Sequence, residues 1–202
     1  MDKQVIVTIG REYGSAGHEI GEELAKRLNI KFYDRAIIED IAKETGLDKG
    51  LIEKYDEKSR VPFISRTVRG FSNSIEDVIF ELQCQFIREK ADKGESFVLI
   101  GRAGDGVLRG RPYHIPVFIR GDKEEKLARI MEKYSLDRED ALDKMKRHDK
   151  TRKEYHNSKF DTKWGDSRTY DLCINSSPVG LESTIDILEK YVRSRVEKFE
   201  NQ

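Results

Sequence analysis

A glycine-rich turn near the start of the chain carries the residues best suited to bind phosphate. Residues 10–18 follow a short apolar run directly and lead into an amphipathic stretch that predicts a helix. The small residues Gly14, Ser15, Ala16 and Gly17 allow backbone N–H groups to approach an anion, and the start of a helix adds partial positive charge. Taken alone, the turn is equally consistent with a tight strand-to-helix connection that binds nothing.

Two segments further along the chain concentrate positive charge. Residues 144–168 hold nine basic and four acidic side chains, a net charge of +5, and residues 98–121 hold four arginines against Asp105. A charged run is most often a solvated face. Both segments adjoin predicted strands, where phosphates bind in α/β folds, and we therefore interpret them as walls of a phosphate site.

Short apolar runs alternate with amphipathic stretches along the chain. Five of the runs predict buried strands, because they are brief and rich in β-branched or aromatic residues. They lie at residues 5–9, 31–33, 97–100, 115–119 and 172–174. Between them, apolar residues recur at helical spacing. This alternation predicts an α/β fold with right-handed crossovers.

Two segments depart from the alternation. Residues 35–93 contain three helical stretches and no predicted strand, and residues 137–168 contain a long polar helix and a loop. We interpret the first as an insertion at one side of the sheet and the second as a mobile flap. Asp122 and Asp137, each with a second acid three residues later, predict two helix starts.

The overall composition excludes several classes of protein. The 202 residues include 38 basic and 38 acidic side chains, so the chain lacks the basic excess of a binder of nucleic acid or of an anionic membrane. We find no membrane span and no signal peptide, and expect a cytoplasmic protein. Cys84 and Cys173 lie in apolar stretches, which predicts core positions rather than a disulfide. The histidines lack zinc spacing, and we expect no metal site.

Several motifs, in this order, resemble one group of enzymes. Residues 98–106 and the strand after them resemble the third and fourth strands of bacterial cytidylate kinases, where an arginine after a strand binds the monophosphate. Residues 147–152 resemble the lid helix of nucleoside monophosphate kinases. Residues 160–176, the turn at 11–15 and the strand end at 32–34 resemble segments of the cytidylate kinase-like proteins. The resemblance spans nearly the whole chain.

This resemblance implies a P-loop architecture of the nucleoside monophosphate kinase type. The expected fold is a single domain over residues 1–202, a three-layer α/β/α arrangement around a five-stranded parallel sheet. Residues 35–93 would be the helical insertion that binds the monophosphate, and residues 137–168 the lid. The implied reaction moves the γ-phosphoryl group of ATP to a nucleoside monophosphate, with CMP or dCMP as the first guess. Such transfer depends on positioning and positive charge, which this sequence supplies mainly as arginine.

The resemblance also implies roles at the two nucleotide sites. Arg102 would hold the acceptor phosphate, and Asp34 and Arg35 would lie at the mouth of the acceptor site. Arg66 and Arg69 could also reach it, although a solvated loop is the simpler interpretation. The residues expected to bind the donor phosphates are Arg11, Gly14, Ser15, Ala16, Gly17 and His18.

The lid would supply the catalytic residues. Arg147 and Arg152 are expected to cover the transferring group when the lid closes, and Asp149 to orient one of them. Guanidinium groups suit this role, because they bind phosphate through two parallel hydrogen bonds and remain protonated.

The turn departs from the P-loop pattern at its lysine. Aligning Ala16 with the second glycine of the pattern places Gly17 where the lysine stands and His18 where the magnesium-binding hydroxyl stands. Arg11 or His18 could substitute for the lysine, and Asp105 could help to hold Mg²⁺ through water, although the magnesium ligands are not identifiable. Two hypotheses stay open: an active kinase that uses ATP and Mg²⁺, or a regulatory protein that binds nucleotide or phosphate without transfer. Monomer and homodimer are equally open.

Overall fold

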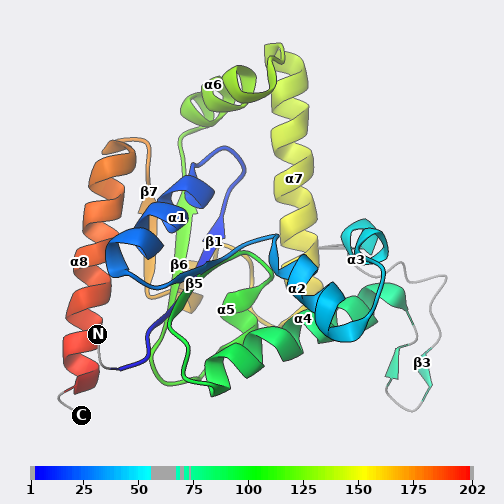
Figure 1. The fold of residues 1–202 in the computed structure, drawn as a ribbon. Coiled ribbons are helices and arrows are strands. Elements are labelled where there is room, and N and C mark those ends of the chain that lie inside the picture. Colours follow the sequence, from blue (N-terminus) through cyan, green and yellow to red (C-terminus); the bar gives the residue numbers. More distant parts are fainter. Residues whose placement is uncertain (1–2, 56–66, 69–70, 73, 201–202) are drawn as a thin grey trace.

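The computed structural model describes residues 3–55, 67–68, 71–72 and 74–200, and its centre is one large sheet. Five parallel strands follow the order β2-β5-β1-β6-β7 (Figure 1). Their bounds are Ile6–Arg11 for β1, Lys31–Tyr33 for β2, Phe97–Ile100 for β5, His114–Arg120 for β6 and Leu172–Asn175 for β7. After β1 the chain forms β2 and β5 on one side of β1, and then β6 and β7 on the other side. The carboxyl end of β1 is therefore the switch point at which such folds bind ligands.

The central strands form because their side chains are apolar on both faces. Ile6, Val7 and Ile9 of β1 and all four residues of β5 are at most 2% exposed. Burial on both faces requires a helical layer on each side of the sheet. The predicted five-stranded parallel sheet and three-layer α/β/α fold are confirmed.

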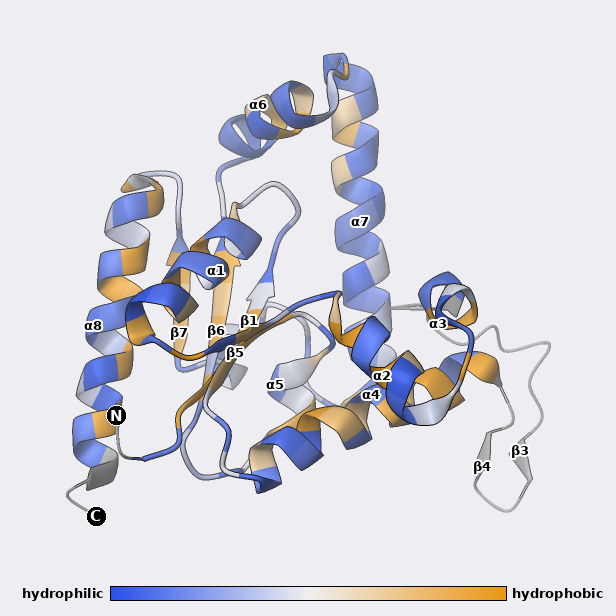
Figure 2. Ribbon diagram, viewed as in Figure 1, coloured by the Kyte–Doolittle hydropathy of each residue, from blue (hydrophilic) through white to orange (hydrophobic). Residues whose placement is uncertain are grey.

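Helices cover the two faces of the sheet (Figure 2). On one face, α1 (Gly17–Leu28) and α8 (Gly180–Glu200) share a core with the strands, in which Leu24 and Leu188 are fully buried. On the other face, α4 (Ile75–Asp92) and α5 (Gly104–Val107) share a second core with β5. In the described ranges, no helix combines the length and the apolar composition needed to cross a membrane.

The segment between β2 and β5 contains α2 (Ile37–Thr45), α3 (Lys49–Tyr55) and α4. It also contains a short antiparallel pair, β3 (Thr67–Val68) and β4 (Phe71–Ser72), so the prediction of no strand over residues 35–93 was wrong. The residue types explain the pair: β-branched and aromatic residues favour strands, and a glycine stands between the two segments in the sequence.

A helical hairpin rises from the carboxyl edge of the sheet (Figure 1). It consists of α6 (Lys123–Tyr134) and α7 (Arg138–Lys159) and is followed by the short helix η1 (Ser167–Thr169). Asp137 caps α7, since its carboxylate accepts the Asp140 N–H at 2.8 Å, as its spacing predicts. Beyond α7, Trp164 packs edge-on against Phe118 of β6, with 5.1 Å between the ring centroids. Both contacts lie in the segment that we predicted to be a flap.

The two cysteines have different surroundings. Cys84 is buried in α4, as predicted, whereas Cys173 is exposed, so its predicted core position was wrong. The reason is that β7 is an edge strand with lower burial than β1 or β5. Both are free cysteines in the structure.

A buried histidine at the start of β6 is expected to make the free energy of unfolding depend on pH. His114 Nε2 is hydrogen-bonded to Thr8 Oγ1 at 2.8 Å, and burial lowers the pKa of His114 to about 4. The unfolded chain binds this proton more tightly, so the free energy of unfolding is expected to fall as the pH drops from about 6.5 toward 4. Chemical denaturation across this range measures the slope. His114→Gln should flatten it, and an unchanged slope in that variant would contradict the assignment.

Candidate active site

The predicted phosphate-binding turn joins β1 to α1 at the carboxyl edge of the sheet. Gly14 has a φ of +85°, and Ala16, directly before α1, has a φ of +59°. A Cβ atom on Gly14 would lie 2.9 Å from the Lys126 carbonyl oxygen, so the position requires glycine. Ser15 is buried, and its hydroxyl donates to the Glu12 carbonyl oxygen at 2.9 Å. Ser15 can therefore meet a ligand only through its backbone, next to the first N–H groups of α1.

Arg11, the last residue of β1, fills the space beside Gly17. A Cβ atom on Gly17 would lie 2.7 Å from Arg11 Cβ and 3.0 Å from Arg11 Cγ. Real Cβ atoms do not approach carbon so closely, so a lysine cannot stand at position 17 while Arg11 keeps this conformation. Arg11 instead brings a cation to the turn cavity from the strand side.

Tyr13 of the turn packs against both helices of the hairpin. His148 of α7 stacks on the Tyr13 ring with 4.2 Å between centroids, and Tyr134 of α6 lies parallel to it at 6.3 Å. The Arg152 guanidinium lies 5.4 Å from the centre of the same ring. Arg152 Nη1 also donates to the Arg11 carbonyl oxygen at 3.2 Å. These contacts bring Arg152 to the turn beside Arg11.

Asp149 anchors α7 to the same turn. Its Oδ1 accepts the Tyr13 N–H at 2.6 Å, and its Oδ2 lies 4.0 Å from Lys126 Nζ. Lys126 Nζ in turn donates to Glu12 Oε2 at 2.7 Å. Burial raises the pKa of Asp149, although the Tyr13 N–H and the charges of Lys126 and Arg152 act in the opposite direction. Through its hydrogen bond to the Tyr13 N–H, the Asp149 side chain therefore positions the turn. Its charge also attracts the guanidinium of Arg152.

Replacing Asp149 with leucine is expected to loosen the turn. The variant leaves the Tyr13 N–H without its acceptor, which costs about 1–3 kcal/mol in the free energy of unfolding. Asp149→Asn keeps an acceptor oxygen and removes a buried charge, so it should cost less than about 1 kcal/mol. Denaturant titration compares the two variants, and hydrogen exchange at the Tyr13 amide should accelerate in Asp149→Leu alone. Equal destabilisation by both variants would contradict the anchoring role.

Arg102 follows β5 in an uncommon backbone conformation. Gly101, Arg102 and Ala103 have φ values of +73°, +58° and +48°. The left-handed region costs a residue with a side chain about 1–2 kcal/mol, and such strain clusters at functional sites. The Arg102 residue is only 4% exposed. The Arg102 side chain is thus buried at the carboxyl end of the strand beside β1.

Asp34 and Arg35 follow β2 at the same edge. Asp34 Oδ2 lies 2.9 Å from His18 Nε2, and Asp34 Oδ1 accepts the Ala36 N–H at 2.8 Å. Partial burial would raise the pKa of Asp34, but these hydrogen bonds and the charge of Arg102 outweigh it and lower the pKa. Asp34 therefore stays ionised and fixes the His18 ring beside the turn.

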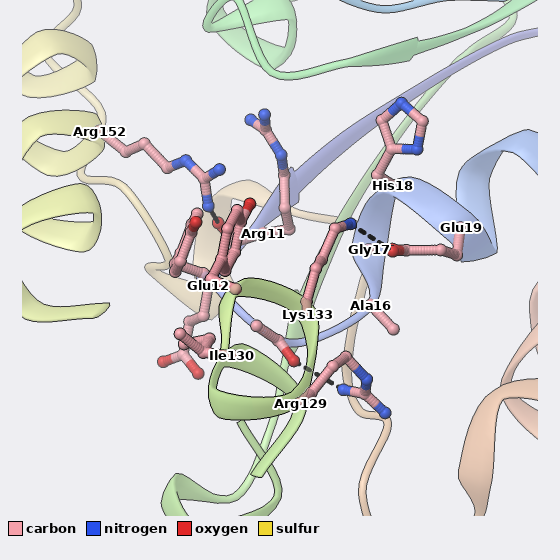
Figure 3. Close-up of a pocket in the computed structure, with 13 residues that line it drawn as sticks. Arg11, Glu12, Ala16, Gly17, His18, Glu19, Arg129, Ile130, Lys133 and Arg152 are labelled. Atoms are coloured by element: carbon pink, nitrogen blue, oxygen red, sulfur yellow. Dashed lines mark hydrogen bonds and ion pairs between the residues drawn. The ribbon is translucent and has the colours of Figure 1, made fainter. Parts of the chain in front are cut away.

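Two cavities meet at this edge. The turn cavity, of about 260 Å³, lies between the turn, α6 and α7 (Figure 3). The strand-end cavity, of about 410 Å³, lies beside the ends of β2 and β5. Arg11, His18 and Arg152 line both. The turn cavity is also lined by the predicted residues Gly14, Ala16 and Gly17, and the strand-end cavity by Asp34, Arg35, Arg102 and Arg147.

Among the predicted site residues, Ser15 and Asp149 line neither cavity. Ser15 is turned inward by its hydrogen bond, and Asp149 is turned toward the Tyr13 backbone. Arg66 and Arg69 lie outside the described residues.

Besides the apolar Ile130, three residues of α6 line the turn cavity although the sequence interpretation assigned them no role: Arg129, Lys133 and Tyr134. Arg129 Nη1 donates to the Gly14 carbonyl oxygen at 2.6 Å, and Lys133 Nζ donates to Glu19 Oε1 at 3.1 Å. The sequence did contain a signal for this contribution, because Arg129 and Lys133 are four residues apart and therefore share one face of the helix. The predicted flap began only at residue 137, which left α6 out.

The side chains around the cavities do not fit a magnesium site held by the protein. Over the part of the chain that the structure describes, no group of three His, Cys, Asp or Glu residues could hold a metal ion. Asp105, expected to help through water, is 8% exposed and lies 2.7 Å from His156 Nε2. Its carboxylate is paired with that histidine, and Asp105 also lines a small cavity of about 20 Å³ with Arg102 and Arg152. We assign no step to magnesium.

Comparison with known proteins gives consistent relatives. The model of the cytidylate kinase-like family matches residues 6–178. A cytidylate kinase of Methanococcus aeolicus is 24% identical over 95% of this chain and 99% of its own length. An uncharacterized protein from Eubacterium ventriosum, of known crystal structure, is 36% identical with a TM-score of 0.76, covering 95% of this chain and 99% of that one. Shikimate kinase from Bacteroides thetaiotaomicron is 13% identical with a TM-score of 0.56, covering 94% and 98%, and shares the P-loop kinase fold.

Proposed function

Because the chain belongs to the cytidylate kinase-like family, we propose that it moves the γ-phosphoryl group of ATP to a nucleoside monophosphate. CMP and dCMP are the first acceptors to test. The observation that carries this proposal is that two cavities share Arg11 and Arg152 at the carboxyl end of β1. A donor in one cavity and an acceptor in the other would place their phosphates on either side of two guanidinium groups.

The turn cavity is the proposed donor site. Its floor is formed by the turn and the start of α1, where backbone N–H groups and the helix dipole favour an anion. The turn is held by the buried Ser15 hydroxyl, by Arg129 and by Asp149, so its N–H groups are positioned before a ligand arrives. Such preorganisation lowers the cost of binding.

The strand-end cavity is the proposed acceptor site. Five arginines line it against two carboxylates, an excess that suits a monophosphate with a charge of about −2. Arg102 is the proposed ligand of that phosphate, because it is buried, lines this cavity and can form two parallel hydrogen bonds. Asp34 and Arg35 would lie at its mouth. Residues 35–93 would then be the acceptor-binding insertion, and residues 137–168 the lid.

In the proposed transfer, an oxygen of the acceptor phosphate attacks the γ-phosphorus. The bond between that phosphorus and the β–γ bridging oxygen breaks, and ADP leaves with the electron pair. The protein must position both phosphates and stabilise the negative charge spread over the transferring group. Arg11 supplies the cation that Gly17 cannot, and Arg152 and Arg147 of α7 add charge from the lid side.

One observation favours an alternative function. Because Gly17 has no side chain at the lysine position, the same site could bind a nucleotide as a regulatory signal without transferring phosphate. The lid arginines favour transfer, since a binding module has little use for Arg152 in the lining of both cavities and Arg147 beside it in the strand-end cavity.

A coupled assay with ATP, magnesium and a panel of nucleoside monophosphates tests the proposal. We expect at least one acceptor to produce ADP well above the rate without acceptor. If no acceptor does so while ATP still raises the melting temperature, the kinase proposal fails and the binding function remains.

A further inference from the structure

An ion pair joins α6 to the first turn of α1 at the turn cavity. Lys133 Nζ donates to Glu19 Oε1 at 3.1 Å, and both residues line the cavity (Figure 3). We propose that Lys133 is a ligand of the donor polyphosphate and that Glu19 is its counter-ion while the site is empty. This inference deepens the proposed function, on which it rests.

The placement of Lys133 follows from its neighbour one helical turn earlier. Arg129 Nη1 donates to the Gly14 carbonyl oxygen at 2.6 Å, which sets α6 against the turn. Lys133 lies four residues further along the same helix face. Figure 3 shows its side chain extended toward the start of α1, near Gly17 and His18. An ammonium group there lines the same cavity as the turn whose backbone N–H groups would bind the donor phosphates.

Glu19 occupies a place that favours any anion. Burial would raise the pKa of Glu19, but its own backbone N–H and Lys133 outweigh that effect and lower the pKa. The carboxylate is therefore ionised in the first turn of α1, where the helix dipole stabilises negative charge. Without a ligand, the Glu19 carboxylate accepts the hydrogen bond of Lys133 and balances its charge, as a phosphate oxygen would.

The exchange of Glu19 for phosphate should be easy. The two side chains are 58% and 43% exposed, and an exposed ion pair of this kind contributes at most about 1 kcal/mol. A polyphosphate carries more charge than one carboxylate and accepts stronger hydrogen bonds from an ammonium group. Glu12, the other carboxylate in the cavity lining, is compensated by Lys126 and does not compete for Lys133.

Direct binding measurements test the inference. We expect Lys133→Met to weaken the binding of ATP and of inorganic tripolyphosphate about tenfold in calorimetry, and to leave CMP binding unchanged. Glu19→Gln removes the competing carboxylate, so it should bind both probes as tightly as the unmodified chain or severalfold more tightly. Lys123→Met is the matched control, because Lys123 begins the same helix and lies outside the cavity lining.

The outcomes separate this inference from the proposed function. If phosphoryl transfer is observed but Lys133→Met binds tripolyphosphate like the Lys123 control, only the role of Lys133 is overturned. If no acceptor is phosphorylated but binding still depends on Lys133, the kinase proposal fails and the phosphate-binding role stands. Weaker binding in Glu19→Gln than in the unmodified chain would overturn the role of Glu19 as a competing counter-ion.

Discussion

Replacing Arg11 with methionine is expected to lower kcat about 10²- to 10³-fold for the best acceptor. The magnitude is that of removing one preorganised electrostatic group from a transition state. Arg11 lines both cavities and lies against Gly17, so it lies where donor and acceptor phosphates would meet. Methionine keeps much of the aliphatic stem in that space and removes the charge. Steady-state kinetics with ATP and CMP measure the loss.

The matched control is Arg120→Met. Arg120 ends the neighbouring strand β6, is exposed and lines neither cavity. Its replacement should leave kcat within about twofold. Arg11→Lys should fall between the two variants, because it keeps the charge and loses the two-pronged hydrogen bonding of the guanidinium. If Arg11→Met retained kcat within a few fold, the transfer role of Arg11 would be wrong.

Arg102→Met should raise KM for the acceptor about 100-fold and leave the dissociation constant of ATP nearly unchanged. The reason is that Arg102 lines the strand-end cavity and is absent from the lining of the turn cavity. Losing a buried guanidinium that would bind a phosphate through two charged hydrogen bonds costs on the order of 3 kcal/mol. Product formation against acceptor concentration and calorimetric titration with ATP separate the two effects.

Arg109→Met is the control for Arg102. It removes an exposed arginine from the same basic segment and should change neither constant. Melting temperatures of both variants show whether the fold is intact, which matters because Arg102 is buried. Equal weakening of ATP and acceptor binding by Arg102→Met would contradict its assignment to the acceptor site.

Strand positions were predictable because their cause is local. An apolar run such as Phe97–Ile100 has no polar face, so it must be covered on both sides wherever it lies in the fold. The same pattern could not tell a central strand from an edge strand. Leu172–Asn175 has a similar composition but lies at the edge, which is why Cys173 is exposed.

The site was predictable where its residues adjoin strand ends. Arg11, Arg102 and Asp34 end or follow strands, and the carboxyl ends of parallel strands meet at one edge. The contribution of α6 was not predictable, because it depends on how a helical hairpin leans on the turn. The bonds that set this angle join residues more than 100 positions apart: Arg129 to Gly14, and Asp149 to Tyr13. Sequence spacing carries no information on such pairs.

The close approach of Arg11 to Gly17 makes two ways of charging the turn mutually exclusive. A side chain at position 17 and the arginine stem at position 11 claim one volume, so Gly17→Lys in the present chain would add a collision rather than a second cation. Restoring the usual lysine would require glycine at position 11 in the same molecule, because the nearest atom to a Cβ at position 17 is Arg11 Cβ. If Arg11 acts as proposed, the strand supplies the charge that the lysine supplies from the helix in the usual pattern, and a motif search that requires the lysine would miss chains of this kind.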